Sequence, residues 1–412
     1  MNWSTRSIRE ASRNGDYGRV VRLARTDARL SQRQLGDASG LSQSAISRLE
    51  SRGAASYDMA VLARVASHLR IPLGIVGLAE RVQVSGPMER RNFLTAAAAT
   101  AAAPVISSIA PDRHTDDSQT APVRMATTAY RRLDGVTPAR QLIEPVRAHL
   151  QLVQNLAQGE EDDRQRARLA AAGSEAASLA GWLSWDMGDL GSARTWYGTS
   201  ITAARRAGDH LLTAYQIGSM AQLEAHTGNG AQALALVTTA RRQLDSPMAV
   251  ADAWLLTIEA LAHAAIGAAA AADRALNAAG DATDHLADEA PPPWPWVFPF
   301  NQAKVAAARL SCGVRLGLTE WISTAQDATD PVLTSGHEKQ RALLLLDIAH
   351  GHLAAGRLDG AFAMARTALE TGLRYRSGRT VERARTLRRA YKSRTPPRVV
   401  REFDELLHDA HL

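Results

Sequence analysis

Apolar positions recur with helical spacing along almost the whole chain, and short glycine-containing turns separate the helical stretches. Residues 17–79 contain five short patterns of this kind, which predict a compact helical domain. From position 122 onwards, longer helical patterns alternate with turns. Apart from residues 297–300, no alternating apolar segment bounded by hairpin turns is present. The expected fold class is therefore all-α, with two helical parts.

Within the first part, one stretch reads LSQRQLGDASGLSQSAISRLESRG and has the signals of two consecutive helices. Ser31 can cap the first helix, and Gln34 stands three residues later, as in a reciprocal capping box. Gly40 then provides a sharp turn, and Ser42 can cap a second helix over residues 43–51. Apolar contacts between the two helices are expected from Leu35, Ala38, Leu41, Ile46 and Leu49. The pattern predicts a helix-turn-helix.

The second part repeats itself around glycines in predicted turns. Small residues lie seven positions before, five after and twelve after each glycine, and the first two spacings between glycines are 40 and 39 residues. The four sets are Gly181, Gly188, Ala193, Ser200; Ala221, Gly228, Ala233, Ala240; Ala260, Gly267, Ala272, Ala279; and Ala349, Gly356, Ala361, Ala368. A further glycine, Gly317, precedes Gly356 by 39 residues, but the small residues at the fixed offsets are poorly kept around it.

A glycine at such a position lets a helix end in a left-handed cap, and small residues at fixed offsets let neighbouring helices pack closely. The pattern predicts stacked helix hairpins over about residues 164–377. The arrangement resembles tetratricopeptide (TPR) repeats, with helices longer than those of the usual unit of about 34 residues. An irregular, alanine-rich helical bundle is the alternative.

The helix-turn-helix region resembles the Cro/phage-repressor-like (XRE) family of DNA-binding domains. The matching segments are Val21-Arg22-Leu23, Ser31-Gln32, Gly40-Leu41-Ser42 and Ile46-Ser47-Arg48-Leu49-Glu50, followed by Leu62, Ala66, Leu69 and Ile71. Two positions depart from the family pattern. Gly36 stands in place of the usual alanine and is expected to soften the first helix of the motif. Gly53 follows one residue later than the family's glycine, so a different loop geometry is expected there.

The resemblance implies that the exposed side of the motif binds DNA. Gln32, at the start of the first helix, is implied to contact a phosphate. On the second helix, Gln43 can bond adenine and Arg48 can bond guanine in the major groove. Arg33 and Arg52 flank the helices and are expected to neutralise phosphates. The predicted DNA-contacting residues are Gln32, Arg33, Ser42, Gln43, Ser44, Ser47, Arg48 and Arg52. The alternative is a structural helical domain with solvated polar positions.

Charge distribution agrees with a polyanionic partner for the first domain. The chain has 412 residues and a net charge of +6, and residues 1–90 hold 14 arginines, no lysine and 8 acidic residues. The whole excess of positive charge therefore lies in this segment, although an arginine-rich solvated surface would show the same balance. Cys312 is the single cysteine, which excludes a disulfide framework and favours a reducing compartment.

The predicted domains are residues 1–82 and 121–412, joined by a linker over residues 83–120 that is rich in Ala, Ser, Thr and Pro. The linker contains a string at residues 90–94 that resembles a twin-arginine export signal. Such signals are N-terminal, and the alanine run after it is weakly hydrophobic and interrupted by proline, so neither export nor a membrane span is expected. Met88 could act as an internal start. A cytoplasmic, nucleoid-associated protein is expected.

Aromatic residues, rare elsewhere, concentrate in the segment PPPWPWVFPFN at residues 291–301. They could line an effector pocket in the repeat domain or fill a gap at an irregular joint between two repeats. The candidate pocket residues are Trp294, Trp296, Phe298, Phe300 and Asn301. The basic stretch at residues 374–401 is expected to form terminal capping helices, with a second anion-binding surface as the alternative. No metal-ligand spacing, phosphate-binding loop or catalytic constellation is found, so no metal, cofactor or enzymatic activity is expected.

These features together indicate a sequence-specific transcriptional regulator with a C-terminal repeat domain that senses an effector. The combination looks like the peptide-pheromone receptors of Gram-positive bacteria and resembles actinobacterial regulators of this layout. The resemblance implies three partners: double-stranded DNA, a second copy of the chain in a homodimer, and a peptide or protein bound to the repeats. The alternative is a TPR scaffold that recruits a protein partner to DNA without a small effector.

Overall fold

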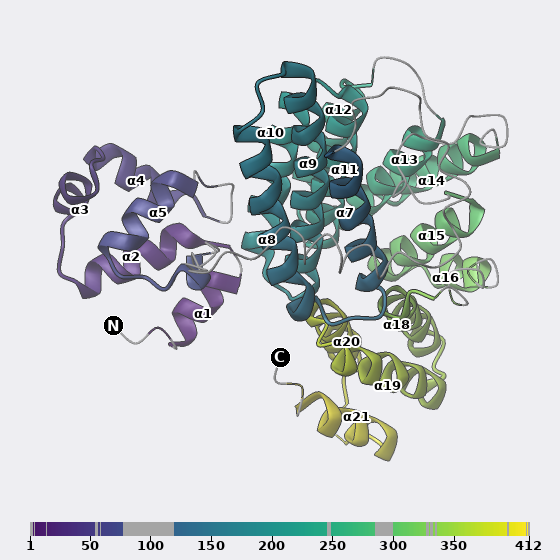
Figure 1. Ribbon diagram of the computed structural model, residues 1–412. Helices are drawn as coiled ribbons and strands as arrows, with labels where there is room; N and C mark the ends of the chain where they lie inside the picture. Colours follow the sequence, from purple (N-terminus) through teal and green to yellow (C-terminus); the bar gives the residue numbers. More distant parts are fainter. Residues whose placement is uncertain are drawn as a thin grey trace.

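The computed structural model describes residues 3, 5–13, 15–53, 57, 59–76, 119–244, 249–284, 300–326, 329, 333, 336–393, 395–408 and 410. Every regular element within these ranges is helical, and they contain no strand, which confirms the all-α prediction (Figure 1). The predicted linker at residues 83–120 and its twin-arginine-like string lie outside the described residues, except for the last two linker positions.

The N-terminal domain, hereafter the head, consists of six short helices. They are α1 (Arg6–Arg13), α2 (Tyr17–Asp27), α3 (Gln32–Ser39), α4 (Gln43–Ser51), α5 (Met59–His68) and the 3-10 helix η1 (Leu73–Val76). The last five confirm the five helices predicted within residues 17–79. Helix α1 was not predicted, but its Ile8 is 1% exposed and joins the core formed by Val20, Leu35, Ile46 and Leu62. The predicted apolar pattern thus forms one hydrophobic cluster.

The helix-turn-helix has the predicted turn and caps. The Ser31 hydroxyl accepts a hydrogen bond from the Gln34 backbone N–H (3.1 Å), and the Gln34 side chain accepts one from the Ser31 N–H (2.8 Å). Gly40 ends α3 with φ of 65°, a left-handed conformation that glycine adopts without strain. Ser42 caps α4 by accepting from the Ala45 N–H at 3.2 Å. These caps satisfy backbone donors that the helix starts would otherwise leave unpaired.

Gly36 has a packing role at the crossing of α3 and the turn. A Cβ atom at this position would lie 2.7 Å from the carbonyl oxygen of Leu41, closer than real Cβ contacts occur. Gly18 is more tightly enclosed, since a Cβ there would lie 2.2 Å from the carbonyl oxygen of Leu49. Both glycines allow α2 and α3 to approach the backbone of the turn and of α4.

The remainder of the chain, hereafter the repeat domain, is an array of antiparallel helix hairpins (Figure 1). Its first helices are α7 (Thr120–Asp134), α8 (Ala139–Gln158), α9 (Asp163–Asp186), α10 (Leu190–Ala207), α11 (His210–His226) and α12 (Gly230–Arg241). It continues with α13 (Ala249–Ala265), α14 (Ala269–Asp284), α15 (Gln302–Leu316), α16 (Thr319–Gln326), α18 (Glu338–Ala354), α19 (Leu358–Arg374), α20 (Gly378–Ala390) and α21 (Arg398–His408).

The repeat prediction is confirmed in its geometry. The five turn glycines all have left-handed φ angles, and each lies in the turn between the two helices of one hairpin: Gly188 (80°), Gly228 (89°), Gly267 (77°), Gly317 (70°) and Gly356 (73°). The alanines at the predicted offsets are each 0% exposed. Small side chains therefore occupy the contacts between helices, as close stacking requires. Helices α20 and α21 close the C-terminal end and bury Leu387 and Phe403.

The head contacts the repeat domain at the start of α2, which lies against the start of α10. A Cβ on Gly15 would lie 2.5 Å from the Cα of Gly191, so the two backbones touch. Tyr17 is 1% exposed, and its hydroxyl lies against Gly191. Burial, and then the nearby charge of Asp189, raises the pKa of Tyr17. The tyrosine therefore fills a contact between the two domains as a neutral group.

Candidate nucleic-acid interface

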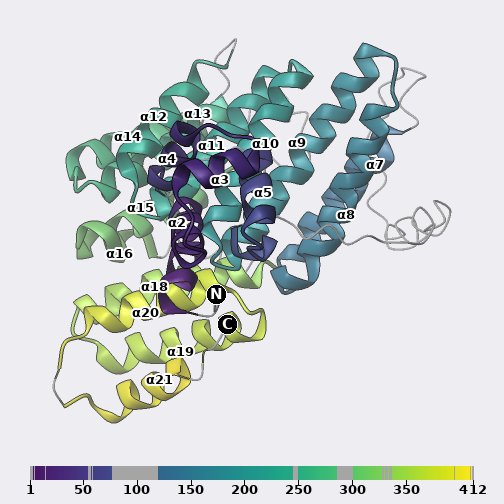
Figure 2. The same ribbon diagram turned by 90° about the vertical axis from the view of Figure 1, so that its left-hand side faces the viewer.

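Helices α3 and α4 lie on the side of the head that faces away from the repeat domain (Figures 1 and 2). On α4, Gln43 and Ser47 are one turn apart, and so are Ser44 and Arg48, so the four share one face. Six of the eight predicted DNA-contacting residues are exposed, namely Arg33, Ser42, Gln43, Ser44, Arg48 and Arg52, while Gln32 and Ser47 are half-buried. The structure therefore brings Gln43, Ser44, Ser47 and Arg48 together on one face of α4 and leaves each of the eight residues at least partly accessible.

Two glutamines on this surface are held in place by a chain of hydrogen bonds. The Gln43 Nε2 donates to the Gln32 Oε1 at 2.8 Å, and the Gln32 Nε2 donates to the Glu50 Oε2 at 2.9 Å. Glu50 also accepts from the Arg25 Nε at 2.5 Å and from the second guanidinium nitrogen at 3.0 Å. The Gln43 side chain is thus connected, through Gln32, to an ion pair in the interior of the head.

Glu50 and Arg25 form an ion pair behind this surface, which the sequence analysis did not predict. The Glu50 side chain is 3% exposed and that of Arg25 is 15% exposed, so the pair lies largely out of water. The hydrogen bond that Arg25 donates to Glu50 raises the pKa of Arg25. The position of Glu50 in the sequence is one signal that could have indicated the pair. A glutamate in the last turn of a helix interacts unfavourably with the helix dipole, so its presence there suggests a specific partner.

Electrostatics of the surface favour a polyanion. Within the described part of the chain, Arg33, Arg48 and Arg52 form no ion pair, and all three are exposed. Their guanidinium groups are therefore available to phosphates or base edges. Ser42 is engaged differently, since its hydroxyl caps α4 and lies 3.0 Å from the hydroxyl of Ser44.

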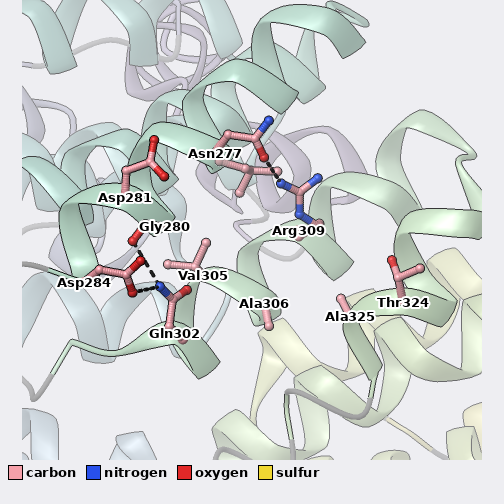
Figure 3. A pocket seen from close by; sticks show the side chains of 11 residues that line it. Asn277, Gly280, Asp281, Asp284, Gln302, Val305, Ala306, Arg309, Thr324 and Ala325 are labelled. Atoms are coloured by element: carbon pink, nitrogen blue, oxygen red, sulfur yellow. Dashed lines mark hydrogen bonds between the residues drawn. The ribbon is translucent and has the colours of Figure 1, made fainter.

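A second candidate site is a cavity of about 710 Å³ between α14, α15 and α16 (Figure 3). Its polar wall is largely paired internally. Arg309 donates to Asn277 Oδ1 at 2.6 Å, and the Gln302 Nε2 donates to the Gly280 carbonyl at 3.0 Å and to Asp284 Oδ1 at 2.7 Å. Few of its polar groups are left to select a ligand.

Of the predicted aromatic pocket, only Phe300 and Asn301 fall within the described residues, and Trp294, Trp296 and Phe298 lie outside them. The Asn301 side chain caps α15 by accepting from the Lys304 N–H at 3.2 Å. Phe300 packs against the apolar cluster of the neighbouring repeats. Neither residue lines the 710 Å³ cavity, so the effector pocket stays a prediction.

The same described ranges show no sign of a metal site or of a membrane span. They contain no group of three or more His, Cys, Asp or Glu side chains placed to hold a metal ion. None of their helices combines the length and the apolar character that a membrane span needs. Cys312 is buried among the repeats, and burial raises the pKa of its thiol to about 12.

Fold and surface define a protein with an N-terminal helix-turn-helix and a C-terminal helical repeat domain. A family model described as a helix-turn-helix domain matches residues 16–74. Among solved structures, the chain is similar to Bacillus thuringiensis PlcR in a crystal structure with the peptide PapR7 and DNA. The identity is 15% and the TM-score 0.35, over 83% of this chain and 98% of that one. Comparison with curated proteins gives no match.

Proposed function

We propose that the chain is a sequence-specific DNA-binding transcriptional regulator of the Cro/phage-repressor-like type. The observation that carries the proposal is the exposed face of α3 and α4, on which Gln43 is oriented by Gln32 and Glu50. A side chain held in one orientation loses less conformational entropy when it bonds a base. Arg33, Arg48 and Arg52, which form no ion pair with the described residues, supply the sequence-independent attraction to phosphates.

In this proposal, Gln43 and Arg48 on α4 read base edges in the major groove, since a glutamine suits adenine and an arginine suits guanine. Gln32 and Arg33, at the start of α3, hold the backbone, where helix N-terminal donors and a guanidinium suit a phosphate. The same Gln32 would then contact DNA and position Gln43, which links phosphate binding to base reading.

The two classes of contact are expected to respond differently to substitution. A preferred site is first selected from random duplex DNA, and binding is then measured by fluorescence anisotropy at several salt concentrations. Arg48→Ala should cost about 1–3 kcal/mol on the selected site and relax the base preference at one position. Arg33→Ala should weaken binding to selected and random duplexes alike and reduce the salt slope by about 1.

Arg274→Ala, which removes an exposed arginine on α14, is the charge-matched control and should leave both measurements unchanged. An Arg48→Ala variant that loses the same affinity on selected and random DNA would contradict base reading by this residue. No site enrichment at all with the full-length protein would contradict the proposed function itself.

We propose further that the repeat domain forms the contact of a homodimer and binds an effector or a protein partner. One head presents a single short recognition helix, which rarely gives enough specificity over competing genomic sites. Two heads on a symmetric operator double the contacts, with half-sites about one helical turn or a multiple apart. Because each head touches α10 of its own repeat domain, the dimer geometry would set the separation of the two recognition helices.

Sedimentation of the full-length protein tests the dimer. At micromolar concentration the sedimentation coefficient should correspond to two chains, because a repeat domain of this size has ample surface for a two-fold contact. A full-length protein that stays monomeric and still binds one asymmetric site tightly would remove the dimer. A protein partner that co-purifies in place of a small effector would favour the scaffold alternative.

A further inference from the structure

Five helices of the repeat domain are joined by a circuit of side-chain contacts. The first half of the circuit runs from α20 through α9 to α11. The guanidinium of Arg379 lies 4.5 Å from the ring centroids of both Trp182 and Trp185. The Trp185 ring in turn lies 5.3 Å from that of His226. An arginine is thus placed against two indole faces beside an imidazole.

The second half of the circuit returns from α11 to α20 through α15 and α18. Arg315 donates to the Ala225 carbonyl at 2.6 Å and lies 3.0 Å from the His226 Nδ1. One turn earlier on α15, the Ser311 hydroxyl donates to Asp347 at 2.5 Å. Asp347 also accepts from the Arg383 Nε at 2.8 Å, and Arg383 is one turn from Arg379. The circuit therefore closes and brings three arginines to one region.

These three arginines, Arg315, Arg379 and Arg383, are called the inner arginine cluster below. Among the residues that the structure describes, Arg383 alone of the three has a carboxylate partner, Asp347. Within the described residues, Arg315 bonds carbonyl and imidazole groups and no carboxylate, and the buried Nε of Arg379 has no hydrogen-bond partner. Arginine guanidinium groups gathered inside a protein normally have anionic partners, because burying an uncompensated charge is costly.

The nearest other carboxylates are already engaged. Asp134 and Asp186 lie 2.6 Å and 3.0 Å from the Nζ of Lys339, so one lysine charge offsets part of their charge. Burial lowers the pKa of Arg379, although these two carboxylates counteract it. Burial, and then Arg383, lowers the pKa of Arg315 to about 10. The cluster therefore has an excess of positive charge.

The residues of the cluster keep part of their surface exposed. Arg315, Arg379 and Arg383 are all half-buried, and so are His226 and Trp182 next to them. Burial, and then the charges of Arg315 and Arg383, lowers the pKa of His226 well below its usual value, so the imidazole is neutral and adds no competing charge. Unused guanidinium donors next to indole faces suit a ligand that combines an oxyanion with an apolar part.

We propose that the inner arginine cluster binds the oxyanion group, carboxylate or phosphate, of a small diffusible ligand. Arg379 provides the unused donor, while Arg315 is held by Ala225 and His226, and Arg383 by Asp347, so that these two contribute charge. The site extends the function proposed above, because it gives the chemical class of an effector, but it does not depend on DNA binding. Measurement on the full-length protein without DNA keeps the two proposals separate.

Isothermal titration calorimetry at constant ionic strength tests the site with inorganic phosphate and with succinate as probes. The full-length protein should show saturable binding of at least one probe, and Arg379→Gln should weaken it by about tenfold or more, because charge-assisted bonds to a guanidinium are strong. Arg379 is the informative position because it makes no hydrogen bond to the described residues whose loss would disturb the fold. Arg274→Gln, on exposed α14, should bind like the wild type.

Thermal unfolding provides a second readout. Phosphate stabilises most proteins by exclusion from their surface, and this effect should be equal in the wild type and in Arg379→Gln. Binding should add a saturable rise of the melting temperature in the wild type alone. Binding of phosphate but not succinate would identify a phosphate ligand, and the reverse a carboxylate. If Arg379→Gln fails to fold, Arg379→Lys keeps the charge but not the planar fork and should bind more weakly than the wild type.

Absence of saturable binding with both probes up to about 10 mM, a concentration at which even a millimolar site would fill, would overturn the proposal. Equal affinities of the wild type and Arg379→Gln would also overturn it, because the anion would then bind elsewhere. If the wild-type protein does not bind DNA, the results of these titrations are unaffected. That outcome would count only against the proposed regulatory function.

Discussion

Lys339→Met is expected to lower the free energy of unfolding by about 3–5 kcal/mol. The Lys339 Nζ lies 2.6 Å from Asp134 Oδ1 and 3.0 Å from Asp186 Oδ2, and the three side chains are 3% to 4% exposed. Removal of the ammonium leaves two carboxylates in an environment that disfavours their charge, with no counter-ion between them. Urea denaturation followed by circular dichroism measures the loss.

The same substitution should affect how the repeat array closes. Lys339 belongs to α18, Asp134 to α7 and Asp186 to the end of α9. The Ser377 hydroxyl, just before α20, also donates to Asp186 at 2.6 Å. These contacts join the first repeat to the last ones, although the residues are 153 to 205 positions apart in sequence. Lys339→Met is therefore expected to loosen the C-terminal helices against α9.

The pH dependence of the loss provides a stricter test. Burial alone would raise the pKa of Asp134, but the hydrogen bond from His337 and the charge of Lys339 lower it to about 2. In the wild type this carboxylate stabilises the fold above its unfolded value of about 3.9, and the contribution disappears as the pH falls toward 2. Without Lys339, burial should dominate and raise the folded pKa above the unfolded one, so the variant should gain stability as the pH falls.

The difference between wild type and Lys339→Met should therefore be smaller at about pH 5 than at about pH 7. Lys392→Met, at an exposed lysine after α20, is the matched control and should change stability by less than about 0.5 kcal/mol. A loss for Lys339→Met as small as that of the control would show that the cluster contributes no net stability. A loss that grows toward low pH would contradict the assigned carboxylate pKa shift.

The local structure of this protein could be predicted from its sequence because local signals determine it. The Ser31–Gln34 capping box, the Gly40 turn and the five left-handed glycines of the repeats depend on residues close in sequence. Their backbone requirements restrict which residue types fit, so the pattern is visible without a structure. Helix α1 was missed because its sequence is mostly polar, and few of its residues, such as Ile8, enter the core.

Long-range polar pairs could not be predicted in the same way. Arg25 and Glu50 are 25 positions apart, and Lys339 is 205 positions from Asp134. Nothing in the local sequence distinguishes these residues from the many charged side chains that remain in water. Their partners are set by how helices cross and how the repeats curve, which no local pattern specifies. The exposure of Gln43, Ser44 and Arg48 on α4 could be predicted, while the buried ion pair behind them could not.

Glu50→Ala is expected to weaken both the fold of the head and its binding to DNA. Loss of the carboxylate leaves the largely buried Arg25 unpaired and removes the acceptor of the Gln32 Nε2. Because Arg25 is partly exposed, we expect a cost of about 2–3 kcal/mol, below that of a fully buried pair. Hydrogen exchange of the backbone amides in α2 to α4 should accelerate by about thirtyfold or more, since each 1.4 kcal/mol corresponds to a factor of ten.

The double variant Arg25→Leu/Glu50→Met separates stability from orientation. Replacing both members of an ion pair by apolar residues is often nearly neutral, so exchange in α2 to α4 should return toward the wild-type rate.

In the double variant, Gln32 would still lack its acceptor, and Gln43 would lose the fixed orientation that depends on it. Affinity for the selected site should therefore stay reduced by about tenfold, while affinity for random DNA recovers, because the arginines that we propose to bind phosphates are unchanged. Glu402→Ala, at an exposed ion pair with Arg398, should alter neither measurement. If the double variant regains full affinity for the selected site, Glu50 serves only the stability of the head, and the proposed role of the glutamine chain in reading DNA is wrong.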